Sequence, residues 1–156
     1  MRYIGLDLGT KTLGISISDK LGIIASSYTV LRFSNEDYNS LLLPLSKIIK
    51  EYEIKIAVLG LPKNMDNSLG FASNRSLNFK KLLEDNLGIE VILEDERLSS
   101  VEANNIMIMQ DTSRKKRKAN VDKVASTIIL QRYLDRRKEK WAWKRILLNL
   151  WIIKEI

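Results

Sequence analysis

The stretch RYIGLDLGTKTLGISIS, residues 2–18, sets the expectation for the fold. Its first part, residues 2–6, is short and apolar, which predicts a strand. Residues 13–18 alternate apolar and small polar side chains, the period-2 pattern of a half-buried second strand. Residues 9–11, Gly-Thr-Lys, provide a tight turn between the two, and residues 23–30 continue as a third strand. We therefore expect the chain to open with an antiparallel meander.

Beyond this meander the apolar residues change to helical spacing, and the two periods then alternate. The pattern predicts a helix over 37–52, a strand over 56–60, a helix over 75–87 closed by Gly88, a strand over 90–94, a helix over 101–110 and a helix over 121–138. Helical crossovers make the first, fourth and fifth strands parallel. The expected fold is α/β, a mixed five-stranded sheet flanked by helices.

Composition limits the chemistry that the chain can carry. Its 156 residues include no Cys and no His, which excludes disulfides, Cys nucleophiles, Cys/His zinc sites and the usual Ser-His-Asp triad. A metal site would need oxygen ligands, which favours Mg²⁺ or Mn²⁺. The net charge of +7 favours a polyanionic partner. Since we find no secretory signal and no apolar run of about 18 residues, we expect a cytoplasmic protein without a transmembrane span.

The chain divides into two predicted parts. Residues 1–138 are expected to form one domain, and residues 139–156 form an apolar helical extension. This extension is too apolar to be a free tail, whereas Lys144, Arg145 and Lys154 interrupt it and argue against a span. The favoured interpretation is a helix packed on its own domain or on a second copy in a homodimer. Attachment to a membrane surface or a ribosomal contact is the alternative.

Asp7 is the first candidate catalytic residue, because it interrupts an apolar strand at its end. A carboxylate there is costly unless it is paired or bound to a metal ion, although it would also serve to cap the following turn. Ligands of such sheets bind at the carboxyl ends of the strands, so the cluster Glu94-Asp95-Glu96-Arg97 belongs to the same edge. Alternation sends Asp95 and Glu96 to opposite faces. We choose Glu96 as the second acidic residue, with Asp95 as the alternative and a solvated ion pair as the simpler interpretation.

Asp122 is the third candidate, in the first turn of the last predicted helix. Helical spacing places it on the same small and apolar side as Ser126, towards the sheet, although an acid there also stabilises a helix start by itself. Together Asp7, Glu96 and Asp122 would coordinate two Mg²⁺ or Mn²⁺ ions. Such a pair activates water and stabilises the leaving oxygen in phosphodiester hydrolysis.

One threonine and six basic residues near these acids are candidate contacts to nucleic acid. They are Thr10 and Lys11 in the turn after Asp7, and Arg114, Lys115, Lys116, Arg117 and Lys118 in a predicted loop over 111–120. Cationic side chains and turn N–H groups bind phosphates without reading sequence. The alternative is that the charge run is simply a solvated loop.

Four segments, in this order, resemble the YqgF/RuvX family of the RNase H-like superfold. They are residues 4–16 (IGLDLGTKTLGIS), 60–66 (GLPKNMD), 95–103 (DERLSSVEA) and 121–131 (VDKVASTIILQ). The first segment is not specific by itself, since sugar kinases and actin-like ATPases open similarly. Asn67-Ser68 and Ser126 depart from the family pattern, which usually has Gly-Thr and Ala at these places.

The resemblance implies a bacterial nuclease, a hydrolase acting on phosphodiester bonds, whose acidic positions fall on Asp7, Glu96 and Asp122. It implies either maturation of the 5′ end of precursor 16S rRNA, a role in ribosome biogenesis with structured RNA as partner, or resolution of Holliday junctions, with branched DNA as partner. We favour the RNA. A non-catalytic RNA-binding assembly factor remains an alternative, whereas an actin-like phosphotransferase would need a second domain that 156 residues do not supply.

Overall fold

The computed structural model describes residues 1–62, 69–95 and 114–155, and of residues 114–120 and 122 it describes the backbone alone. The predicted helix over 101–110 lies outside these residues. The elements, in chain order, are β1 (Arg2–Leu8), β2 (Thr12–Ser18), β3 (Ala25–Arg32), the 3-10 helix η1 (Tyr38–Leu41), α1 (Leu42–Glu51), β4 (Ile54–Leu61), α2 (Phe71–Leu87), β5 (Glu90–Asp95) and α4 (Arg114–Glu155).

The five strands form one mixed sheet in the order β3-β2-β1-β4-β5. β1 pairs antiparallel with β2, and β2 with β3, which confirms the predicted meander. β1 pairs parallel with β4, and β4 with β5, as the helical crossovers between them require. The carboxyl ends of β1, β4 and β5 therefore lie at one edge of the sheet.

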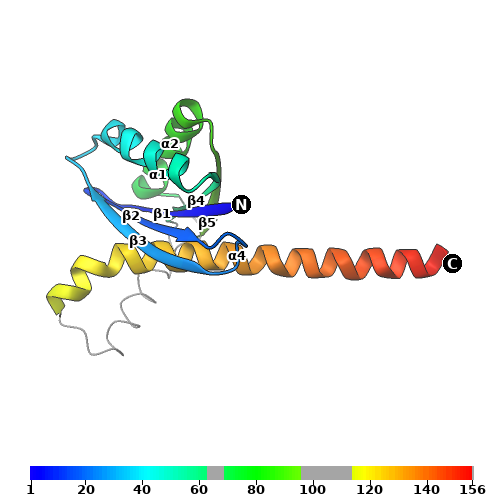
Figure 1. The fold of residues 1–156 in the computed structure, drawn as a ribbon. Helices are drawn as coiled ribbons and strands as arrows, with labels where there is room; N and C mark the ends of the chain where they lie inside the picture. Colours follow the sequence, from blue (N-terminus) through cyan, green and yellow to red (C-terminus); the bar gives the residue numbers. More distant parts are fainter. Residues whose placement is uncertain (63–68, 96–113, 156) are drawn as a thin grey trace.

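Helices cover both faces of this sheet (Figure 1). On one face α1 and α2 pack on a large apolar cluster that includes Leu6 and Leu59. On the other face α4 packs through Ile129 against Tyr3 and Val58. Successive side chains of a strand point to opposite faces, so the odd-numbered positions of β1 face α4. This mixed, helix-covered sheet confirms the predicted fold class.

The helix α4 begins earlier and ends later than the sequence predicted. Residues 114–118, expected in a loop, form its first turns. The expectation was wrong because Lys and Arg are good helix formers, and no Gly or Pro interrupts residues 114–122. At the other end the helix continues without a break to Glu155, well past the sheet (Figure 1).

Residues 138–155 form the exposed end of α4, called the arm below. Every one of these residues is exposed, so the arm does not pack on its own domain, which was one of the expected arrangements. A second copy, a membrane surface and the ribosome are the expected partners that remain. Within the described parts of the chain, no helix has both the length and the apolar content that crossing a membrane requires.

Candidate active site

Asp7 lies near the carboxyl end of β1, and only 8% of the residue is exposed. It shares the face of Tyr3, which packs in the cluster under α4, so its side chain belongs to the α4 side of the sheet. Burial removes water from a carboxylate and makes its charge costly unless donors or a cation compensate it. The fold thus holds a carboxylate in a position where a cation would stabilise it.

Glycine positions flank Asp7 on the neighbouring strands. Gly14 of β2 is its direct partner. On the other side Leu6 lies beside Leu59, and the next residue along β4 is Gly60. Since glycine has no side chain, neither of these positions places a side chain beside the Asp7 carboxylate.

Successive residues of β1 on this face contact successively earlier residues of α4. Near the start of β1, the ring of Tyr3 lies 5.7 Å from that of Tyr133, measured between centroids. Two residues further on, a Cβ atom at Gly5 would lie 2.7 Å from Cβ of Leu130 and 2.8 Å from the carbonyl oxygen of Ser126. Movement along β1 towards its carboxyl end therefore leads towards the start of α4.

A buried hydrogen bond holds α4 against β2 at this level. Ser16 Oγ donates to the carbonyl oxygen of Ser126 at 2.8 Å, and both residues are fully buried. Ser126 Oγ in turn donates to the carbonyl oxygen of Lys123 at 2.8 Å. Residue 122 lies one helical turn before Ser126, so its backbone is held close to this contact. The side chain of Asp122 is outside the described part of the chain.

The end of β5 contains an ion pair that the sequence did not reveal. Glu94 is only 4% exposed, and its carboxylate accepts a hydrogen bond from the Arg136 guanidinium of α4. Burial raises the pKa of Glu94, and the Arg136 charge opposes that rise. The signal available in the sequence was weak. It consisted of a carboxylate two residues before Glu96 and an arginine in a predicted helix, and nothing in the sequence predicted that this helix packs on this strand.

The orientation of Glu94 also places its neighbour Asp95. Glu94 faces α4, whereas Val91 and Leu93 pack in the cluster under α1 and α2. Asp95, which pairs with Leu61, therefore lies on the α1 and α2 face, opposite to that of Asp7. Glu96, the residue chosen from the sequence, lies outside the described residues.

The turn after β1 is held by backbone hydrogen bonds. Gly9 N donates to the carbonyl oxygen of Thr12 at 2.8 Å, and Phe33 N donates to that of Lys11 at 3.0 Å. Thr10 and Lys11 are both exposed, as a phosphate contact requires. The other predicted phosphate contacts, Arg114, Lys115, Lys116, Arg117 and Lys118, lie on the first turns of α4, and their side chains are outside the described residues.

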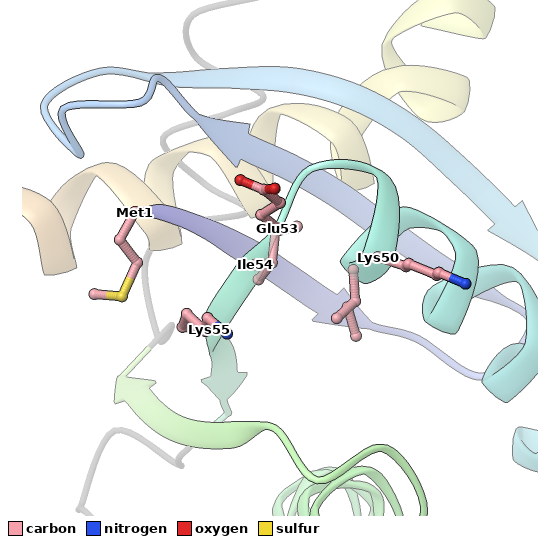
Figure 2. A pocket seen from close by; sticks show the side chains of 6 residues that line it. Met1, Lys50, Glu53, Ile54 and Lys55 are labelled. Atoms are coloured by element: carbon pink, nitrogen blue, oxygen red, sulfur yellow. The ribbon is translucent and has the colours of Figure 1, made fainter.

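The described side chains alone do not assemble a metal site. Among them, no group of three or more acidic residues is close enough to share an ion. Glu96 and the side chain of Asp122 are not among these described groups. A pocket of about 650 Å³ lies elsewhere, between Met1, Lys50 and Glu53 at the start of β1 and β4 (Figure 2). It is at the opposite edge of the sheet from Asp7 and is not a candidate for the acidic site.

The family is decided by the match of a family model, "RuvX: Holliday junction resolvase", to residues 1–136. The chain belongs to the RuvX family. Three relatives named "Putative pre-16S rRNA nuclease" support this. The protein of Clostridium beijerinckii is 46% identical over 86% of this chain and 96% of its own length. That of a Geobacillus species is 47% identical over 86% and 98%. One from Clostridium botulinum is 48% identical over 87% and 98%.

Solved structures of similar fold come from Holliday junction resolvases. RuvC of T. thermophilus, in complex with a Holliday junction substrate, has a TM-score of 0.55 at 13% identity over 88% of this chain and 96% of that one. The fowlpox virus Holliday junction resolvase has a TM-score of 0.50 at 17% identity over 87% and 99%. At this identity the likeness shows the fold, and it confirms the RNase H-like architecture. Membership of the RuvX family confirms the predicted nuclease, a hydrolase of phosphodiester bonds.

Proposed function

We propose that this RuvX-family nuclease is metal-dependent, uses Asp7, Glu96 and Asp122, and processes the 5′ end of precursor 16S rRNA. The observation that carries the proposal is the position of Asp7. Its carboxylate is nearly buried at the carboxyl edge of parallel strands, on the face covered by α4 and between two glycine positions. Binding sites of such sheets lie at this edge.

The path of α4 supports Asp122 as a partner of Asp7. Tyr3 contacts Tyr133, and Gly5 lies against Ser126. The next position of β1 on this face is Asp7, and one turn further towards the start of α4 is Asp122. Two strand residues span about 6.6 Å and four helical residues about 6 Å, so the two steps match in length.

Strand alternation supports Glu96 over Asp95. Glu94 faces α4 and Asp95 lies on the opposite face. If the strand geometry extends by one residue, Glu96 returns to the face of Asp7. The three proposed acids then come from β1, from the residue after β5, and from α4.

The chemistry of this donor set fits Mg²⁺ or Mn²⁺. All three ligands would be carboxylates, and the chain has neither His nor Cys to favour a softer metal. Asp7, Glu96 and Asp122 would hold the ions, which when bound would activate water and neutralise charge on the leaving oxygen. Lys11 and Thr10, exposed in the anchored turn beside Asp7, would position the phosphate backbone.

The substrate assignment is supported by the relatives. Proteins that share 46–48% of residues with this chain and align over almost their whole length carry the name "Putative pre-16S rRNA nuclease". Such a substrate would place the protein in the cytoplasm with ribosome precursors. The family description favours a second candidate, a Holliday junction resolvase. Both polymers offer the phosphates that the basic residues would bind.

A cleavage assay with two substrates tests the proposal. Purified protein is incubated with a precursor 16S rRNA fragment carrying its 5′ leader, and separately with a four-way DNA junction, in Mg²⁺, Mn²⁺ or EDTA. We expect cleavage of the RNA in either metal and none in EDTA. Preferential cutting of the junction would instead establish the resolvase, and no cleavage of either substrate would leave an RNA-binding assembly factor.

The matched variants are Asp7→Asn and Asp85→Asn. Asp85 is an exposed carboxylate on α2, on the other face of the sheet. Asp7→Asn removes one charge and is expected to abolish turnover nearly completely while substrate binding persists. Asp85→Asn should cut at the wild-type rate. An active Asp7→Asn enzyme would exclude the proposed acidic site.

A further inference from the structure

The arm, residues 138–155, is not explained by the reaction of the family. The family match ends at residue 136. The relatives are covered over 96–98% of their own length, whereas the same alignments cover 86–87% of this chain. The arm extends past the sheet at the end of α4 (Figure 1). It therefore lies outside the part of the chain that these relatives share.

The arm exposes an unusual amount of apolar surface. Its large apolar side chains are 48–67% exposed: Trp141, Trp143, Ile146, Leu147, Leu148, Leu150, Trp151, Ile152 and Ile153. Between residues 146 and 153 only Asn149 is polar, so at about 100° per residue apolar groups occupy nearly every side of the helix. A helix that is apolar all round is normally covered.

The charge of the arm favours some of the partners that could cover its apolar surface over others. The arm has five basic residues against two acidic ones. Lys144 and Arg145 precede the apolar segment 146–153, and Lys154 follows it. A second copy of the arm would bring the same excess of positive charge, which opposes pairing. An anionic surface would be complementary to it.

We propose that the arm binds an anionic lipid surface. Trp residues flanked by Lys and Arg are typical of segments that lie at the membrane interface. The segment 146–153 is about 12 Å long as a helix, far short of the roughly 30 Å hydrocarbon core. It can therefore be embedded in one leaflet while Lys144, Arg145 and Lys154 extend to the headgroups.

The geometry of α4 leaves the nuclease edge free in this bound state. The arm begins where Arg137 lies over the ring of Tyr3, 4.9 Å from its centroid, close to the start of β1. Asp7 is at the other end of that strand. A protein held by its arm would therefore have the Asp7 edge at the end of β1 that is far from the bound segment.

Tryptophan emission provides a direct test. The three Trp residues of the chain, Trp141, Trp143 and Trp151, all lie in the arm, so their fluorescence reports on it alone. The full chain is mixed with vesicles of phosphatidylcholine and phosphatidylglycerol at 3:1, or of phosphatidylcholine alone. We expect a blue shift and co-flotation with the anionic vesicles, weakened by salt, and neither with the neutral ones.

Variants separate binding by the arm from binding by the domain. The double change Lys144→Gln and Arg145→Gln should weaken partitioning about 25-fold, since each cation near an anionic surface contributes about a factor of five. Leu150→Glu should abolish binding. The control is Leu43→Glu, on α1, where the leucine is 65% exposed, and it should bind as wild type does. All variants should keep the wild-type cleavage rate, so a failed nuclease assay and a failed lipid assay remain distinguishable.

Three results would overturn the proposal. Equal binding to neutral vesicles would exclude the role of charge. Binding retained by Leu150→Glu would place it outside the arm. A stable dimer in analytical ultracentrifugation, with Trp emission already shifted to the blue and unaffected by vesicles, would identify a second copy as the partner.

Discussion

Asp95 and Glu96 are neighbours in the sequence, and we propose different roles for them. Asp95 lies on the α1 and α2 face, away from Asp7. We expect Glu96→Gln to lower the cleavage rate by about 100-fold or more, the scale seen when one charge-stabilising group is removed from an active site. Asp95→Asn should lower it by less than about threefold. A larger loss in Asp95→Asn than in Glu96→Gln, measured as kcat on the same RNA, would reverse the assignment.

Asp19 gives a prediction for the dependence of stability on pH. Its Oδ1 accepts hydrogen bonds from Ile23 N at 2.7 Å and Ile24 N at 2.9 Å, and these hold the pKa of Asp19 below its ordinary value of 3.8. A lowered pKa means that the unfolded chain binds the proton more tightly. The contribution of Asp19 is therefore present above pH 3.8 and is lost as the pH falls further.

The variant Asp19→Ala lacks both hydrogen bonds and this titration. We expect its midpoint of urea unfolding to be lower than that of wild type at pH 7, with the difference shrinking as the solution is acidified below about pH 4. A difference that stayed constant down to about pH 2.5 would show that the carboxylate charge does not matter to the turn.

At the scale of elements, the close approach of β1 and α4 depends on Gly5. A Cβ atom there would lie 2.3 Å from Ser16 Oγ, as well as within 3 Å of Leu130 and Ser126. Gly5→Ala should therefore push α4 away from the sheet, at a cost of about 1–3 kcal/mol in the free energy of unfolding. Since Asp122 is one turn from Ser126, we also expect a loss of cleavage activity in the folded variant.

Gly88→Ala is the matched control for this change. Gly88 ends α2 with φ of +61°, where alanine is strained, yet nothing lies within 4 Å of the added Cβ atom. It should destabilise the fold by about 1–2 kcal/mol and leave cleavage unchanged under conditions where the protein is folded. Equal activity in the two variants would show that the β1 and α4 contact does not position the acids.

The first turns of α4 are the second element with a testable role. They carry Arg114, Lys115, Lys116, Arg117 and Lys118 on a helix that leads directly to Asp122. Replacing the five by Gln should weaken RNA binding and lower the slope of log K against log salt by about 0.7 for each phosphate that the helix no longer neutralises. Lys47→Gln with Lys81→Gln, exposed on α1 and α2, is the control. An unchanged slope would mean that the segment is only solvated.

The sequence predicted elements well where local pattern determines them. The meander, the parallel strands and the end of α2 at Gly88 follow from side-chain period and turn residues. It failed for the start of α4, because a charge run is compatible with both loop and helix. It also could not predict the Ser16 to Ser126 hydrogen bond or the Glu94 to Arg136 ion pair, since these depend on how the helix is placed on the sheet.

At the scale of the whole molecule, order and spacing in the sequence allowed three candidate acidic residues to be proposed, but did not predict how they are arranged. Asp7 is the one of the three whose side chain the structure describes, and it is nearly buried on the α4 face. The roles of Glu96 and Asp122 remain predictions. What the sequence could not convey is that the helix which contains Asp122 is continuous with the apolar extension.

Because it is continuous, α4 sets a definite distance between the domain and the arm. A helix of 42 residues is about 63 Å long, with Asp122 near one end and Trp151 near the other. A surface that binds the arm would therefore also set the distance and the orientation of the candidate active site relative to that surface. Removing one residue after Lys138 would shorten the distance along α4 between the domain and the apolar segment by about 1.5 Å. It would also rotate that segment by about 100° relative to the domain, without altering a contact within the domain.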